Sequence, residues 1–159
     1  MRSLLAAIIA LSACAIFGGA ASAAGPVREP APPGGPFTVT DVCAFPVQVA
    51  FPEATANTYS LTFTQPDGTV KQIFTGRLVA TFTNLDNPTN TITTNISGPS
   101  IDTFFSDNSA TLVFLGRQGG PNGTVFDLGA GRTVFVVASD GSVTRTQVGH
   151  FLDLCKVLA

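Results

Sequence analysis

The sequence has little of what catalytic and metal sites are usually built from. Its 159 residues include one histidine (His150), one tyrosine and three cysteines, and only 11% of the residues are charged. A zinc site of the His/Cys type is excluded by this inventory, and calcium would need clustered carboxylates at a spacing that is not present. A Ser-His-Asp triad would have to use His150, and no G-x-S-x-G motif accompanies it. We therefore predict no catalytic residue, no metal and no cofactor.

Runs of basic residues are also missing. Lysine and arginine are scattered singly, and the net charge is −2 for the whole chain, or −3 once Arg2 is removed with a leader. Proteins that bind nucleic acid usually carry a basic stripe, and anionic lipid attracts clusters of Lys and Arg. Nucleic acid is therefore not an expected partner.

The N-terminus is typical of a secretory signal peptide. Arg2 precedes an uncharged apolar run at 4–17, and the small residues Ala21-Ser22-Ala23 follow. The run is shorter than the ~20 apolar residues that a transmembrane helix needs. We predict that residues 1–23 are removed, leaving a secreted, extracellular chain without a transmembrane segment. The alternative is a membrane-tethered lipoprotein, because residues 11–14 (LSAC) resemble a lipobox ending at Cys14.

Two cysteines, Cys43 and Cys155, remain after the leader. In an oxidising compartment an even number of cysteines indicates a disulfide, although two buried thiols are the alternative. A bridge requires the two Cα atoms to lie about 4.4–6.8 Å apart. We therefore predict a Cys43–Cys155 disulfide that brings the first and last strands of the domain close together.

Residues 24–36 are rich in Pro and Gly and have almost no apolar anchor, so they predict a disordered or extended linker. From residue 37 to 159, Val, Ile, Thr and Phe recur in short alternating runs separated by turn residues. No stretch is suited to crossover helices. Residues 151–158 are expected to close the domain as either a short helix or a strand. The pattern predicts one all-β domain, an antiparallel β-sandwich or β-barrel of about eight to ten short strands.

Local patterns add detail to this prediction. Asp67, Asp107 and Asp140 sit in turn sequences, where Asp side chains bond the backbone two residues on, and Asp86 is expected to do the same. Phe82 and Ile92 are expected on the buried face of one hairpin. The glycine-rich segments Gly129-Ala130-Gly131 and RQGGPNG at 117–123 are predicted to separate neighbouring strands.

The segment 117–123 is the best candidate for a contact surface. It has no strand-to-helix context and no Lys-Ser/Thr ending, so it is not expected to cradle phosphate. As a polar loop it would present Arg117, Gln118 and Asn122 to a partner.

Three stretches give the chain a family resemblance: DVCAFPVQV at 41–49, VATFTNLDNPTNTITTNISGP at 79–99 and FLDLCKVLA at 151–159. With the Ala-rich leader, the chain resembles small secreted actinobacterial proteins of unassigned function. The resemblance implies an exported β-rich domain closed by a bridge, and it implies no catalytic residue.

The expected function is a non-enzymatic β-domain with a binding or cell-surface role. One alternative is a closed β-barrel that holds a small apolar ligand between its Phe side chains. The other is a small secreted hydrolase that uses His150 or a pair of acids such as Asp102 and Asp127. A pocket joining His150 to a carboxylate and a hydroxyl would favour the hydrolase.

Overall fold

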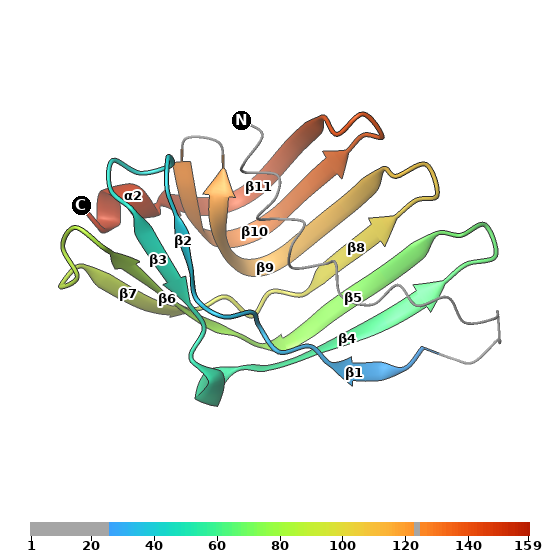
Figure 1. Ribbon diagram of the computed structural model, residues 1–159, viewed down its shortest axis with the longest axis horizontal. Coiled ribbons are helices and arrows are strands. Elements are labelled where there is room, and N and C mark those ends of the chain that lie inside the picture. The colour runs from blue at the N-terminus through green and yellow to red at the C-terminus, as the bar shows by residue number, and fades with distance from the viewer. Residues whose placement is uncertain (1–25, 123–124) are drawn as a thin grey trace.

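The computed structural model describes residues 26–122 and 125–159 (Figure 1). The predicted leader at 1–23, with Cys14, lies outside these residues. In the part described, the strands are β1 (Arg28–Pro30), β2 (Phe37–Val39), β3 (Val47–Ala50), β4 (Asn57–Thr64), β5 (Val70–Arg77), β6 (Val79–Asn84), β7 (Thr91–Asn95), β8 (Ser100–Phe104), β9 (Ala110–Asn122), β10 (Val125–Val137) and β11 (Val143–Asp153). A short 3₁₀ helix covers Glu53–Thr55, and α2 covers Leu154–Val157.

The strands form two antiparallel sheets. The larger has seven strands in the order β1-β4-β5-β8-β9-β10-β11, and the smaller has four in the order β2-β3-β6-β7. Figure 1 shows the small sheet and α2 together at one end of the molecule. The predicted all-β antiparallel fold is confirmed, and of the sandwich and barrel alternatives it is the sandwich. The described residues form 11 strands, where about eight to ten were predicted. No helix among these residues is long and apolar enough to cross a bilayer.

The hydrophobic core lies between the small sheet and one end of β10. Val47 and Val49 of β3 and Phe82 of β6 are almost completely buried, as is Phe126 of β10. The rings of Phe82 and Phe126 meet edge to face, with their centroids 5.5 Å apart, which is a preferred geometry for aromatic pairs. Phe82 is paired with Ile92, which packs against the same core, as predicted.

Three hairpins of the large sheet have the same turn. The backbone amides of Thr69, Ser109 and Ser142 donate to the carboxylates of Asp67, Asp107 and Asp140 at 2.8–2.9 Å. Residues 68, 108 and 141, which follow these aspartates, have positive φ angles, and they are Gly, Asn and Gly. Glycine and asparagine tolerate this conformation best. Hydrogen bonds from Thr69, Ser109 and Ser142 lower the pKa of the respective carboxyl groups. The turn prediction is confirmed at these three sites.

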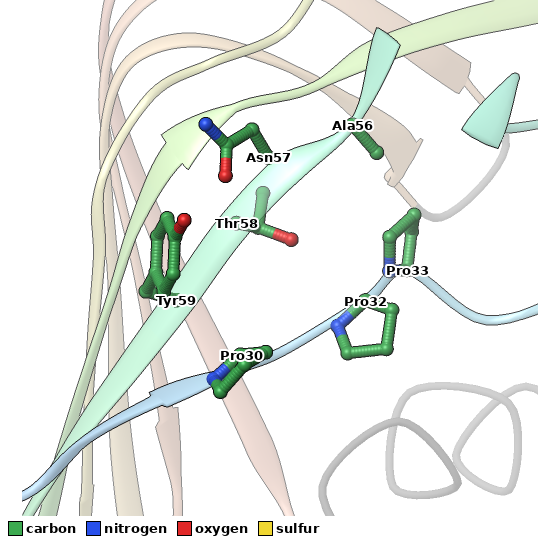
Figure 2. Close-up of a pocket in the computed structure, with 7 residues that line it drawn as sticks. All are labelled: Pro30, Pro32, Pro33, Ala56, Asn57, Thr58 and Tyr59. Atoms are coloured by element: carbon green, nitrogen blue, oxygen red, sulfur yellow. The ribbon is translucent and has the colours of Figure 1, made fainter. Parts of the chain in front are cut away.

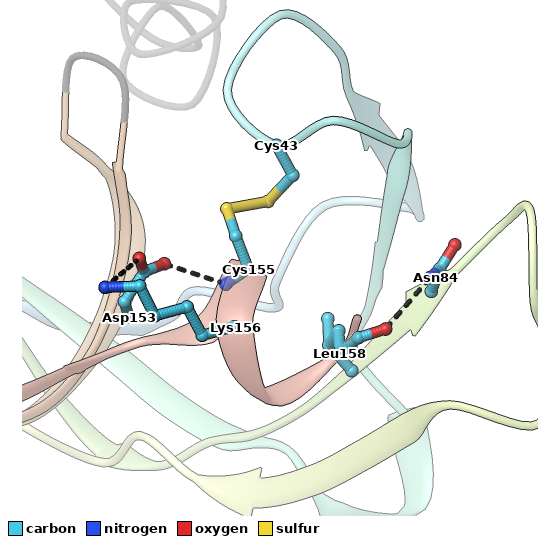
Figure 3. The surroundings of a disulfide bond; sticks show 6 residues. All are labelled: Cys43, Asn84, Asp153, Cys155, Lys156 and Leu158. Carbon is cyan, nitrogen blue, oxygen red and sulfur yellow. Dashed lines mark hydrogen bonds and ion pairs between the residues drawn. A yellow bond between two sulfur atoms is a disulfide. The ribbon is translucent and has the colours of Figure 1, made fainter.

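At the fourth predicted turn, Asp86 is a backbone hydrogen-bond donor and not the side-chain acceptor that was predicted. Asn84 accepts hydrogen bonds from the amides of Asp86 and Asn87, so the turn is held by the asparagine. The Nδ2 group of Asn84 donates to the Leu158 carbonyl at 2.9 Å (Figure 3). This buried side chain therefore ties the end of the chain to the small sheet.

The predicted disulfide is present. Cys43 and Cys155 are bonded, with their Cα atoms 5.3 Å apart and a sequence separation of 112 residues (Figure 3). The sequence led us to expect a bridge between the first and last strands, but neither cysteine lies in a strand. Cys43 precedes β3, and Cys155 lies in α2, whose first turn is capped by the Asp153 carboxylate. The bridge therefore links a loop of the small sheet to the helix that follows the large one.

The Pro-rich segment after the leader is partly paired. Arg28–Pro30 forms β1 at the edge of the large sheet, in register with Tyr59 to Leu61 of β4. The guanidinium of Arg28 lies 3.8 Å from the centre of the Tyr59 ring. This stacking and the edge pairing hold a segment that has few apolar side chains to bury.

Two predicted turns are strand in the structure. Residues 117–122 continue β9, and Gly129-Ala130-Gly131 lies inside β10. The pairing explains why: Gly116 faces Gly131, and Gly131 faces Gly149 of β11. We name Gly116, Gly131 and Gly149 the glycine row. Glycines in strand interiors mark bends and close backbone approach, and Figure 1 shows β9 and β10 strongly curved.

Two positions of the row, Gly131 and Gly149, are packed too closely to hold side chains. A Cβ at Gly131 would lie 2.1 Å from the Val148 carbonyl oxygen, and one at Gly149 would lie 2.3 Å from that of Ala130. Both contacts are with backbone atoms, which cannot move aside without disturbing the sheet. Gly116 and Gly149 also have positive φ angles, of 74° and 143°.

We expect Gly131→Ala to lower the free energy of unfolding by about 1–3 kcal/mol, the usual cost of overpacking. Gly34→Ala is the matched control, because a Cβ there meets nothing within 4 Å, and it should change stability by less than about 0.5 kcal/mol. Urea unfolding measures both. Equal midpoints for the two variants would contradict a tight contact at Gly131.

We expect Cys43→Ala/Cys155→Ala to lower the free energy of unfolding by about 2–5 kcal/mol, because the bridge closes a long loop in the unfolded chain. Wild-type protein treated with a reductant should unfold at the same denaturant concentration as the variant. A midpoint that does not move on reduction would show that the bridge does not constrain the unfolded chain.

Candidate functional site

The bend at the glycine row joins two residues that a straight sheet would keep apart. The Nη2 atom of Arg145 lies 2.9 Å from Oδ2 of Asp127, and both side chains are largely buried. Arg145 is in register with Phe135, eight residues from Asp127 along β10. Eight residues of straight strand span about 26 Å. The ion pair therefore spans the inside of the bend and closes it.

A small pocket of about 140 Å³ lies on this inner side. Its lining comes from the three strands that carry the glycine row: Phe114, Gln118, Gly119, Gly120, Pro121, Asp127, Thr133, Phe135, Arg145, Gln147 and Phe151. We name the side of the large sheet that bears Thr133, Arg145 and Gln147 the pocket face. Strand alternation assigns the other residues of the sheet to it or to the opposite face.

Three polar atoms on the pocket face are buried and have no hydrogen-bond partner among the described residues: Thr133 Oγ1, Arg145 Nε and Gln147 Nε2. They are neighbours, since Thr133 is in register with Gln147, which is two residues from Arg145 on β11. Thr133 is only 1% exposed. A buried polar group without a partner costs about 1–3 kcal/mol, so a cluster of three favours a partner from outside the described chain.

Aromatic rings surround this polar cluster. Phe114 and Phe135 meet edge to face, with ring centroids 5.9 Å apart. The Arg145 guanidinium lies 5.5 Å from the centre of the Phe135 ring, within the range of a cation–π interaction. Phe151 completes the wall. Because Asp127 neutralises the Arg145 charge, the pocket offers hydrogen-bond donors in an aromatic setting with little net charge.

Besides Asp127, the carboxyl group of Asp102 lies on the pocket face. Asp102 of β8 is only 6% exposed, and its Oδ1 atom has no hydrogen-bond partner in the part of the chain described. Burial raises the pKa of Asp102 to about 6, although a hydrogen bond with the Ser100 side chain lowers it in part. Perturbed acids of this kind are common at functional sites.

The structure separates the residues that the sequence grouped as a contact loop. Gln118 lines the pocket, and its Nε2 lies 3.5 Å from the Gly131 carbonyl. Arg117 is exposed and, by alternation, belongs to the opposite face. Asn122 is the last residue of β9, paired with Val125. The prediction of a loop here was wrong because the glycines serve a bend within a strand.

His150 lies away from the pocket. It is exposed and paired with Ala130, and alternation places it on the face opposite Gln147 and Phe151. Of the two acids considered for a hydrolase, Asp127 is engaged by Arg145. His150 therefore lies on the opposite face of the sheet from the Asp127 carboxylate and the Thr133 hydroxyl.

A second hollow, of about 370 Å³, lies between the Pro-rich segment and the start of β4 (Figure 2). Its walls are Pro30, Pro32, Pro33 and residues 56–59. The Thr58 hydroxyl donates to the Ala31 carbonyl, and the Ala31 amide donates to the Thr58 carbonyl. These groups satisfy one another, so the hollow is better explained by the docking of residues 30–33 than by a ligand.

Within the described residues, no group of three or more His, Cys, Asp or Glu side chains is placed to hold a metal ion. Sequence reasoning missed Thr133, Arg145 and Gln147, which are ordinary strand residues when read singly. The signal that could have indicated them was the occurrence of Gly129, Gly131 and Gly149 within two runs of alternating residues. Such glycines indicate a close approach of two strands.

Comparisons of the chain with family models, with curated proteins and with solved structures found no match.

Burial of Asp102 predicts a specific dependence of stability on pH. Its pKa rises from the ordinary value of 3.8 to about 6 in the folded protein, so the fold binds more protons than the unfolded chain between these values. Stability due to this group is therefore present below about pH 4 and is lost as pH rises through 6, by about 3 kcal/mol. Asp102→Asn removes this loss.

Urea unfolding of wild type and Asp102→Asn from pH 4 to pH 7 provides the measurement. Across this range the free energy of unfolding of the variant should rise relative to that of the wild type by up to about 3 kcal/mol. The turn aspartates have lowered pKa values and act in the opposite direction, but they are common to both proteins and cancel in the difference. If the two proteins showed the same dependence of stability on pH, a raised pKa of Asp102 in the folded state would be contradicted.

Proposed function

We propose that the protein is an exported, non-enzymatic binding domain that holds a small neutral molecule in the pocket beside the glycine row. The observation that carries the proposal is the cluster of Thr133 Oγ1, Arg145 Nε and Gln147 Nε2, all buried and without partners among the described residues. A hydrogen-bond acceptor on a ligand would satisfy two N–H donors and a hydroxyl together.

Export is part of this proposal. The leader-like residues 1–23 support it, and so does the disulfide, since such bridges persist in oxidising compartments. A binding role suits a domain whose pocket is held by a rigid sheet and a covalent bridge, because little ordering is needed when the ligand enters.

The size and walls of the pocket define the ligand further. An apolar cavity of about 150 Å³ accommodates benzene, and this pocket has a volume of about 140 Å³. Phe114, Phe135 and Phe151 suit a planar ring. The Arg145–Asp127 pair leaves little net charge, so a neutral carbonyl or amide fits the donors better than a carboxylate does. The proposed ligand has a ring-sized apolar body and one neutral acceptor.

Benzamide, toluene and benzoate test this assignment as probes, with binding followed by ligand-observed NMR. Benzamide should bind more tightly than toluene, which lacks the acceptor, and more tightly than benzoate, which brings a charge. Thr133→Val and Gln147→Leu should each weaken benzamide binding about 2–10-fold, the worth of one hydrogen bond. Thr146→Val, an exposed neighbour on the opposite face, is the control and should have no effect.

Stability of the probe-free protein gives an independent readout. Thr133→Val replaces a buried hydroxyl that has no partner among the described residues with a methyl group of the same shape, so it should leave stability unchanged or raise it. If Thr133→Val is strongly destabilising, the hydroxyl has a structural partner. If benzamide and toluene bind equally, or neither binds, the pocket is not an acceptor site and the proposed function is wrong.

A further inference from the structure

Asp102 lies on the pocket face, on the strand next to β9, and is not itself part of the pocket lining. It is in register with Leu112 of β9, which is in register with Phe135 of β10, a wall of the pocket. On a flat sheet, Asp102 and Thr133 would be separated by two strand spacings of about 4.8 Å and one two-residue step of about 6.6 Å. The apolar side chains of Leu112, Phe114 and Phe135 lie in the interval.

Among the described residues, neither of the two salt bridges involves the carboxyl group of Asp102. On the pocket face its neighbours are Gln72 of β5, Leu112 of β9, and Ser100 and Phe104 of its own strand. None of these can ionise at neutral pH. An ionised carboxylate in a buried position is costly unless it is paired or hydrogen-bonded, yet Oδ1 has no partner among the described residues.

From this we infer that the ligand of the pocket carries a second polar group, a hydrogen-bond donor, at the end away from its acceptor, and that Asp102 receives it. The inference rests on the proposed function, since it describes the far end of the same ligand. A hydroxyl or an ammonium group supplies the donor, and the row of Leu112, Phe114 and Phe135 covers the apolar body between the two ends.

Three matched probes test the inference: 4-(aminomethyl)benzamide, 4-(hydroxymethyl)benzamide and 4-methylbenzamide. They share the ring and the acceptor and differ in the donor. The two donor probes should bind the exported wild-type protein at least about fivefold more tightly than the methyl probe, the effect of one charge-assisted hydrogen bond. Asp102→Asn should abolish the preference for the ammonium probe, whereas the exposed control Asp86→Asn should leave every affinity unchanged.

A pH series separates the two donor chemistries. Asp102 becomes neutral as pH falls from 7 to 5, so an ammonium probe should lose its advantage over the methyl probe in this range, while a hydroxyl probe should keep it. Equal binding of all three probes to the wild type would overturn the inference, as would an unchanged ammonium preference in Asp102→Asn. Binding of benzamide in either case would leave the proposed function intact, whereas failure of every probe would remove both.

Discussion

The close approach of backbone at the glycine row is the constraint on which the rest of the site depends. Gly116, Gly131 and Gly149 face one another across three strands. At Gly131 and Gly149 the neighbouring strand comes so near that even a methyl group would overlap its carbonyl oxygen. The strands can bend there because nothing projects from them. The bend leaves one half of β9 and β10 to pack on the small sheet and turns the other half into a wall of the pocket.

The ion pair and the polar cluster follow from that geometry. Arg145 reaches Asp127 because the strand between them folds back. The pair neutralises two charges and holds the inner side of the bend closed. It engages only some of the polar groups on this side of the strands. Thr133, Gln147 and the Nε atom of Arg145 remain buried without partners in the described chain. A fold that keeps such groups has a cost, and a bound molecule would offset it. The disulfide and Asn84 stabilise the opposite end, where the chain terminates.

The sequence predicted what local chemistry determines. Asp67, Asp107 and Asp140 indicate tight turns through their own side chains. The pairing of Cys43 with Cys155 was predicted from the cysteine count and the expected compartment, and the structure shows it. The prediction failed at glycines, because glycine occurs both in turns and at bends inside strands. Residues 117–122 and 129–131 look like loops because glycine favours turns, and only the register shows that Gly131 faces Gly116 and Gly149. The pocket could not be predicted, since Thr133 and Gln147 become neighbours through pairing between strands, which no local pattern encodes.

The pocket depends most directly on the nearness of Arg145 to Asp127 across the bend. Nuclear Overhauser effects between the side-chain protons of Arg145 and the β-protons of Asp127, measured in the folded protein, report on this distance. Cross-peaks are expected, together with a cross-strand peak between the α-protons of Gly131 and Gly149. If these peaks were absent and the strand pairing were otherwise intact, β10 would run straight, and neither the pocket nor its polar cluster would exist.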